Sequence, residues 1–177
     1  IHIYTALAEI VPKMEEDEIV ILVDCDVFCQ KLPCFEQLRE IASRGHSWFN
    51  QSWPPDYDVN GTLPETLAQI ADVEFGLPGL SFSKFVGGEL FAMTKARLQE
   101  FLAIARKYLY VYNKYRLTEE VLNTVLIAKL GWDASPNDRL IERVWTDRQT
   151  FCNLSSVDLS VPFLHMPAEK QNGFYNF

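Results

Sequence analysis

The sequence has no apolar run of about 20 residues, the length that a helix needs to span a lipid bilayer. Its first ten residues also lack the charged start and the cleavage site of a signal peptide. Basic residues are few, because 16 Lys and Arg face 24 Asp and Glu, for a formal net charge of −8. We therefore expect no transmembrane segment in this chain, and the charge disfavours nucleic acid as a partner.

Cysteine is also scarce, and the four cysteines form no C-x-x-C pair. They are too few to act as a disulfide scaffold for 177 residues, so we expect reduced thiols. Two N-glycosylation triplets begin at Asn60 and Asn153, but they would matter only in a secretory compartment. The sequence leaves localisation open, with the cytoplasm favoured and the secretory lumen as the alternative.

What the chain does contain is enough apolar residue content, 48%, for one globular domain over residues 1–177. Residues 19–23 form an apolar run without alternation, which is typical of a strand covered on both faces in a parallel sheet. Apolar residues at helical spacing predict helices at 4–14, 34–42, 63–71, 94–108 and 117–130. We expect an α/β fold with a mixed, mainly parallel sheet flanked by helices.

Two carboxylates, Asp24 and Asp26, directly follow the predicted strand. In an extended chain residues i and i+2 point the same way, so both would converge outside the strand end, where α/β sheets bind ligands. Carboxylate oxygens suit Mg²⁺ or Mn²⁺, and such an ion suits a diphosphate. A second copy of the pattern, at Asp56 and Asp58, follows no strand, and we interpret it as a solvated turn.

The tail offers further candidates. A predicted strand at 157–165 ends in His165, and Lys170 follows. A lone histidine is usually not a ligand, but this one ends a strand as the two aspartates do. With the lysine it would complete a pocket for a metal ion and a phosphate.

Three other stretches contain candidate substrate-binding or catalytic residues. Gly87 and Gly88, followed by Glu89, allow close backbone approach before an apolar run. Trp48 and Trp53 could stack on a sugar or base face, although buried tryptophans are commoner. Glu119 and Glu120 open a helix after Thr118, a predicted N-cap, where acids also stabilise the helix dipole.

The order of these motifs, from Ile19 to Lys170, resembles GT-A fold glycosyltransferases of the Asp-x-Asp type. The resemblance implies that Asp24 and Asp26 hold a divalent cation on the diphosphate of a nucleotide sugar. It also implies that His165 completes the coordination.

The same resemblance implies that the turn of Gly87, Gly88 and Glu89 shapes the donor and acceptor pocket. Glu119, or more strongly Glu120, would be the catalytic or acceptor-binding carboxylate. The implied activity moves a sugar from a nucleotide-sugar donor to a hydroxyl of a glycan, a protein or a small molecule.

GT-A domains begin with a βαβ half that binds the nucleotide base, and no strand precedes residue 19. We therefore expect a fragment of a longer chain. Two alternatives stay open: a non-catalytic carbohydrate-binding or scaffolding domain, and a metal-dependent nucleotidyl or phosphoryl transferase.

Overall fold

A computed structural model describes residues 2–52, 54, 56–132, 139–147 and 151–167, so the candidates Trp53 and Lys170 lie outside the described residues. The helices are α1 (His2–Ile10), α2 (Phe35–Arg44), α3 (Pro64–Phe75), α4 (Lys95–Tyr115) and α5 (Glu119–Leu130), with a 3-10 turn η1 (Val11–Lys13). The strands are β1 (Ile19–Val23), β2 (Val27–Cys29), β3 (His46–Ser52), β4 (Lys84–Thr94), β5 (Ile141–Arg143), β6 (Thr146–Asp147), β7 (Phe151–Cys152) and β8 (Phe163–His165). The architecture is α/β, as the sequence predicts.

The central sheet has the order β1-β4-β3, and both of its pairings are antiparallel. The predicted mainly parallel sheet is therefore wrong. In β1, Ile19 pairs with Thr94 and Val23 pairs with Leu90. An apolar run reports burial on two faces but not the direction of the neighbouring strand, which explains the error.

Packing of β1 on both faces is confirmed, since the two faces contact different layers, although all five residues of this edge strand are only half-buried. Val20 and Leu22 pack against the core shared with the helices α1, α3, α4 and α5. Ile19, Ile21 and Val23 pack against a second core. That core contains Ile41 of α2, Phe163 of β8 and Ile141 of β5.

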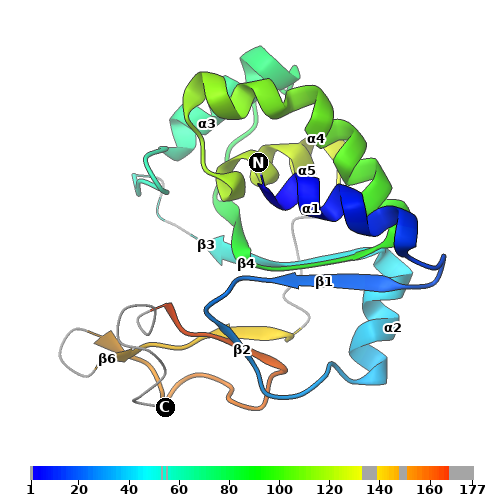
Figure 1. Cartoon of the computed structure of the whole chain (residues 1–177). Helices are drawn as coiled ribbons and strands as arrows, with labels where there is room; N and C mark the ends of the chain where they lie inside the picture. The colour runs from blue at the N-terminus through cyan, green and yellow to red at the C-terminus, as the bar shows by residue number, and fades with distance from the viewer. Residues whose placement is uncertain (1, 53, 55, 133–138, 148–150, 168–177) are drawn as a thin grey trace.

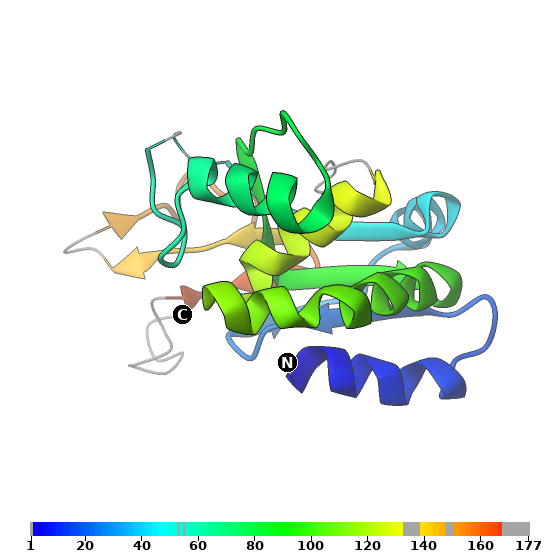
Figure 2. The ribbon, with the colours of Figure 1, turned by 90° about the horizontal axis from the view of Figure 1, so that it is seen from above.

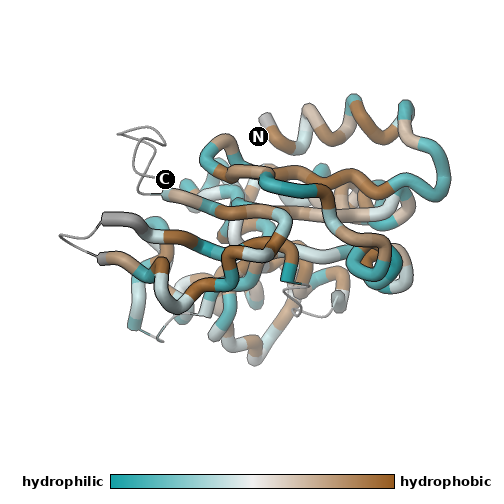
Figure 3. The backbone as a smooth tube through the Cα atoms, turned by 90° about the horizontal axis from the view of Figure 1, so that it is seen from below, coloured by the Kyte–Doolittle hydropathy of each residue, from teal (hydrophilic) through white to brown (hydrophobic). Residues whose placement is uncertain are grey.

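The molecule accordingly has three layers, which Figure 1 shows with the central sheet seen edge-on. Helices α1, α3, α4 and α5 cover one face, and α2 lies with the second sheet on the other. Figure 2 shows α1 and α4 running along the sheet from above. In Figure 3 hydrophobic residues follow the strands, whereas α1 alternates between hydrophobic and hydrophilic residues.

The second sheet has the order β2-β8-β5, with β8 antiparallel to β2 and parallel to β5. Its strands are short, and β8 covers only the end of the predicted 157–165 strand. This sheet matters because Val27 of β2 lies opposite His165 of β8. The candidate histidine is thereby brought beside the aspartates that follow β1.

An irregularity in β4 also positions the site. Trp48 pairs with Phe91 and Asn50 pairs with Val86, so residues 87–90 of β4 lie opposite Phe49 alone. The two candidate glycines fall in this bulge. Bulges commonly occur beside functional sites, because they re-aim side chains out of the regular alternation.

Helix α5 begins where the sequence predicts, but the predicted capping hydrogen bond at its N-terminus is not formed. Thr118 is the N-cap residue of α5, yet its side chain makes no capping hydrogen bond. Gly131 ends α5 in the left-handed conformation, which glycine adopts without steric cost. In the part of the chain that the structure describes, no helix is long and apolar enough to cross a membrane.

Candidate functional site

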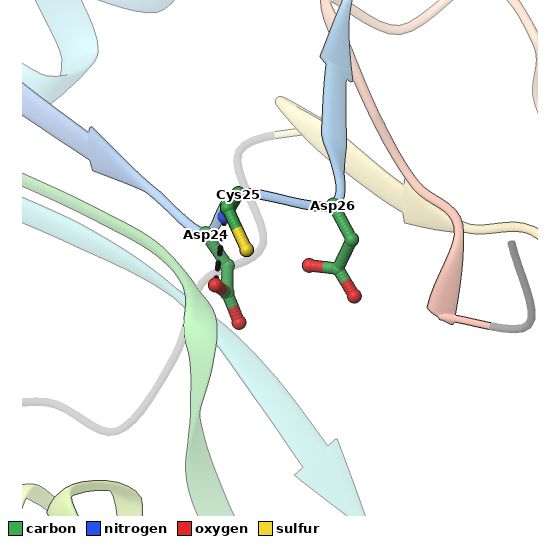
Figure 4. A group of neighbouring side chains, drawn as sticks. All are labelled: Asp24, Cys25 and Asp26. Carbon is green, nitrogen blue, oxygen red and sulfur yellow. Dashed lines mark hydrogen bonds between the residues drawn. The ribbon is translucent and has the colours of Figure 1, made fainter. Parts of the chain in front are cut away.

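The connection between β1 and β2 is a tight turn and not an extended segment. The backbone N–H of Val27 donates to the carbonyl oxygen of Asp24 across 3.1 Å, and the N–H of Cys25 donates to Asp24 Oδ1 across 2.7 Å. The predicted extended geometry is therefore wrong. As Figure 4 shows, the turn brings the side chains of Asp24, Cys25 and Asp26 to the same side of the chain.

Two backbone hydrogen bonds attach this turn to both sheets. The N–H of Asp24 donates to the carbonyl oxygen of Glu89 in β4 across 3.2 Å. The N–H of Met166, after β8, donates to the carbonyl oxygen of Asp26 across 3.1 Å. Both aspartates are thus held by rigid elements, which favours a defined geometry of their carboxylates.

The side chains of this turn form a group that suits a divalent cation. The ligand atoms of Asp24, Cys25 and Asp26 lie within 4.8 Å of one another. Mg²⁺ and Mn²⁺ take carboxylate oxygens, and Mg²⁺ usually binds one or two carboxylates together with substrate phosphates and water. Asp24 and Cys25 are accessible and Asp26 is 3% exposed, so a phosphate ligand would approach from the Asp24 side.

His165 lies beside Asp26, with its Nε2 atom 3.1 Å from Asp26 Oδ2. Its Nδ1 atom lies 3.3 Å from Arg143 Nε and 3.3 Å from Glu89 Oε1. Burial lowers the pKa of His165 below its usual value, although the nearby Asp26 carboxylate opposes this shift. A neutral imidazole that donates from Nε2 to Asp26 and accepts from Arg143 at Nδ1 satisfies these two contacts, but it has no proton on Nδ1 to donate to Glu89.

Coordination of the metal by His165 stays a prediction. In the structure both of its ring nitrogens already face protein partners, one of them a metal-ligand candidate. A carboxylate has about four lone-pair sites, so the bond to His165 is compatible with a cation on Asp26. The geometry favours His165 as the residue that orients Asp26.

Glu89 is part of a buried ionic cluster and not of an open pocket. It is 2% exposed, forms an ion pair with Arg143, and accepts from Gln51 Nε2 at 3.0 Å on Oε1. Burial lowers the pKa of Arg143 below its usual value, although the charge of Asp26 opposes this shift. The contact of Glu89 with substrate stays a prediction; in the structure its carboxylate pairs with the half-buried guanidinium of Arg143, which also contacts His165.

Gly87 and Gly88 leave space for neighbouring carboxylates, and the space is tighter at Gly87. A Cβ atom on Gly87 would lie 2.0 Å from Glu89 Oε2, and one on Gly88 would lie 3.0 Å from Glu120 Oε1. Neither glycine has the positive φ that would exclude other residues. Both therefore make room for carboxylates, and Gly88 in addition donates its N–H to Glu120 Oε1 across 3.3 Å.

Glu120 faces an open cavity of about 610 Å³, which we call the acidic cavity. Its polar lining consists of Asp24, Asn60, Gly88, Tyr112, Thr118, Glu119, Glu120 and Asn123. The Nδ2 atom of Asn60 donates to Glu120 Oε2 across 2.5 Å. One cavity thus joins a cation-binding candidate, Asp24, to both predicted catalytic acids.

Trp48 does not offer a surface for a sugar. Its side chain is 0% exposed, and its ring stacks on His46 at 4.5 Å between centroids. His46 in turn stacks on Trp132 at 4.9 Å. The prediction of Trp48 as a substrate-binding residue is therefore wrong, and its alternative, a buried tryptophan, is confirmed.

Sequence reasoning missed Asn60 and Arg143, which contact Glu120 and Glu89. Asn60 is separated from Glu120 by 60 positions, and no local pattern links the two. The solvated-turn interpretation of Asp56 and Asp58 is confirmed, since both are exposed.

Comparisons of the chain with protein-family models, with curated proteins and with solved structures found no match. The function is therefore argued from the site itself.

Proposed function

We propose that the chain is a GT-A type glycosyltransferase that moves a sugar from a nucleotide-sugar donor to an acceptor hydroxyl, with Mn²⁺ or Mg²⁺ held by Asp24 and Asp26. The observation that carries this proposal is the position of Asp24. Its carboxylate belongs to the ligand group of the turn and also lines the acidic cavity with Glu120. A site for the donor diphosphate and a carboxylate for the acceptor therefore share one cavity.

When bound, the cation would neutralise the charge of the leaving diphosphate as a Lewis acid. Glu120 accepts hydrogen bonds only, because an ionised carboxylate has no donor, so it can hold or deprotonate an acceptor hydroxyl. Asn60 and the backbone of Gly88 fix the orientation of that carboxylate. Such positioning is a large part of catalysis by this kind of site.

The contacts of Glu89, Arg143 and His165 position the second candidate metal ligand, Asp26. Glu89 balances Arg143, Arg143 contacts His165, and His165 contacts Asp26. This sequence of contacts joins β4 of the central sheet to β5 and β8 of the second sheet. It holds Asp26 in place from the side opposite the solvent.

The direct test is a donor screen. Hydrolysis of uridine- and guanosine-diphosphate sugars by the chain should depend on Mn²⁺ and should be lost in Asp24→Asn. The matched control is Asp56→Asn, which changes an exposed aspartate of the second Asp-x-Asp copy. Its hydrolysis rate should equal that of the unchanged chain.

The other outcomes would overturn the proposal. Turnover of nucleoside triphosphates in place of sugar nucleotides would indicate a nucleotidyl or phosphoryl transferase. Carbohydrate binding without any turnover would indicate a binding domain. Equal loss of hydrolysis in Asp24→Asn and Asp56→Asn would mean that the effect is not specific to the turn.

A further inference from the structure

Helix α5 carries two polar side chains in a stretch that is otherwise apolar and buried. From Val121 to Ile127 every residue is buried, and Asn123 and Thr124 are the polar ones. The hydroxyl of Thr124 is satisfied, because it accepts from the N–H of Val86 and donates to the carbonyl oxygen of Glu120. Buried polar groups need such partners, so the amide of Asn123 requires an explanation of its own.

The carbonyl oxygen of the Asn123 side chain is accounted for by Tyr4 of α1. The hydroxyl of Tyr4 donates to Asn123 Oδ1 across 2.6 Å, and the two residues are 5% and 2% exposed. No other described residue accepts a hydrogen bond from this hydroxyl. Burial raises the pKa of Tyr4 above its usual value, so the hydroxyl keeps its proton. A buried phenol that has to donate therefore fixes the amide with its oxygen toward Tyr4.

The amide nitrogen of Asn123 is the group that this contact leaves over. Its Nδ2 atom makes no hydrogen bond to any described residue, and unlike Trp48 Nε1, which also has no partner, it is not sealed from solvent. Asn123 lines the acidic cavity, whereas Tyr4 does not. The oxygen thus points away from the cavity, and the NH₂ group is the part of the side chain that a ligand in the cavity can reach.

Glu120 and Asn123 together offer an acceptor and a donor in one cavity. Asn123 follows Glu120 by three positions in α5, so the two side chains lie on the same side of the helix, and both line the cavity. The carboxylate accepts hydrogen bonds, and the amide nitrogen donates them. A hydroxyl does both, so neighbouring hydroxyls of a polyol can use the two groups at once. Apolar side chains in the same lining, Leu22, Phe91 and Leu117, suit the ring face of a sugar.

We propose that Asn123 is a ligand-binding residue of the acidic cavity, which donates from Nδ2 to a hydroxyl of a polyhydroxylated acceptor, and that Tyr4 is the residue that positions it. The inference rests on the proposed function in calling the ligand an acceptor. The donor itself follows from the contact between Tyr4 and Asn123. Glu120 holds the hydroxyl that reacts, and Asn123 holds a neighbouring one.

The first measurement uses the unchanged chain without sugar nucleotide or metal ion. Methyl glucoside, methyl galactoside and methyl mannoside are titrated into the isotopically labelled chain, and the side-chain amide signals are followed by NMR. The Asn123 pair is identified by its absence in Asn123→Asp or, should that variant not fold, by its proximity to the Tyr4 ring in nuclear Overhauser spectra. At least one glycoside should shift this pair until it saturates.

Two variants then separate binding from positioning. Asn123→Asp keeps an oxygen for Tyr4 but removes the NH₂ donor, and it should weaken glycoside binding at least about tenfold. Tyr4→Phe keeps the ring and removes the hydroxyl that orients the amide, so it should weaken binding by less. Tyr108→Phe is the matched control, because Tyr108 is also buried, stacks on Phe75 and does not line the cavity. Its glycoside affinity should equal that of the unchanged chain.

Manganese titration of the same variants distinguishes a local effect from a general disturbance. Asn123→Asp should keep the Mn²⁺ affinity of the unchanged chain, because Asn123 does not belong to the ligand group of the turn. No shift of the Asn123 signals, unchanged glycoside affinity in Asn123→Asp, or equal loss in Tyr108→Phe would overturn the inference. So would no binding of any glycoside, or parallel loss of glycoside and Mn²⁺ binding.

The outcome is separable from that of the donor screen. Glycoside binding that depends on Asn123, without sugar-nucleotide hydrolysis, would reject the transferase and keep the role of Asn123. Hydrolysis together with glycoside binding that Asn123→Asp does not change would reject the role of Asn123 and keep the transferase.

Discussion

The imidazole of His165 lies 3.1 Å from the carboxylate of Asp26, and both side chains are buried, at 5% and 3% exposure. The two residues are 139 positions apart, and they meet because β2 and β8 pair. This contact turns a strand-end histidine into the partner of a candidate metal ligand. It also links the turn to the Glu89–Arg143 ion pair.

His165→Phe should weaken Mn²⁺ binding by about 10- to 100-fold, the usual effect of removing a group that orients a metal ligand. Calorimetric titration with Mn²⁺ measures this change. His165→Gln should retain more affinity, because an amide N–H can replace the Nε2 donor. Equal, complete loss in both variants would instead support direct coordination by the imidazole.

The two glycines of the β4 bulge should respond differently to alanine. In Gly87→Ala the new Cβ would displace the buried Glu89 carboxylate, and overpacking of this kind costs about 1–3 kcal/mol of unfolding free energy. Gly88→Ala would displace Glu120 by less, and the lower entropy of the unfolded chain offsets about 0.4–1 kcal/mol.

Chemical denaturation and turnover therefore separate the two variants. Gly87→Ala should lower stability, whereas Gly88→Ala should lower turnover with little change in stability. The reverse pattern would contradict the positions of Glu89 and Glu120 in the structure.

Glu120→Gln should reduce sugar transfer by about 10² to 10⁴, the range for a general base or an acceptor-holding carboxylate. Glu119→Gln should reduce transfer much less, because it is the carboxylate of Glu120 that Asn60 and the backbone of Gly88 orient in the cavity. Steady-state rates and melting temperatures are compared for both. Near-unchanged rates in both would leave helix stabilisation as the role of these acids.

Glu74 should make the chain sensitive to acid. Hydrogen bonds from Lys114, Tyr115 and Tyr110 lower its pKa from 4.5 to about 2. A lowered pKa contributes stability above the unfolded value, and this contribution is lost as the pH falls from about 4.5 toward about 2. These bonds join α3 to α4, so the loss should appear in global unfolding.

Denaturant midpoints of Glu74→Gln, measured between pH 6 and about pH 2, should fall less over the acid window than those of the unchanged chain. Glu65→Gln, an exposed acid of the same helix, is the control. Parallel pH profiles for Glu74→Gln and the unchanged chain would show that the Glu74 contacts do not contribute.

Local patterns located the helices well, since the predicted 117–130 helix corresponds to α5 and the predicted 94–108 helix to α4, which however continues to Tyr115. The apolar contacts on both faces of β1 were also predicted, because Val20 and Ile21, which are half-buried, pack against different cores and both positions are apolar. Strand direction was not, because antiparallel pairing with β4 is decided by residues about 70 positions away.

For the site, sequence identified carboxylates but not their partners. Asp24 and Asp26 were found because they follow a strand, yet the turn that aligns them with Cys25 depends on backbone bonds to Glu89 and Met166. Trp48 was assigned to substrate binding because the sequence does not show whether a tryptophan lies in the core or on the surface. Its burial depends on a stack with His46, which no local pattern shows.

The measurement that tests the account most directly is calorimetric titration of Mn²⁺, with a nucleoside diphosphate present, into the unchanged chain, Asp24→Asn and Asp56→Asn. The account predicts that Asp24→Asn weakens Mn²⁺ binding by well over tenfold, more than about 1.4 kcal/mol. Asp56→Asn should bind as the unchanged chain does. Equal Mn²⁺ affinity in all three chains, or no binding by the unchanged chain, would contradict a cation site at the turn after β1.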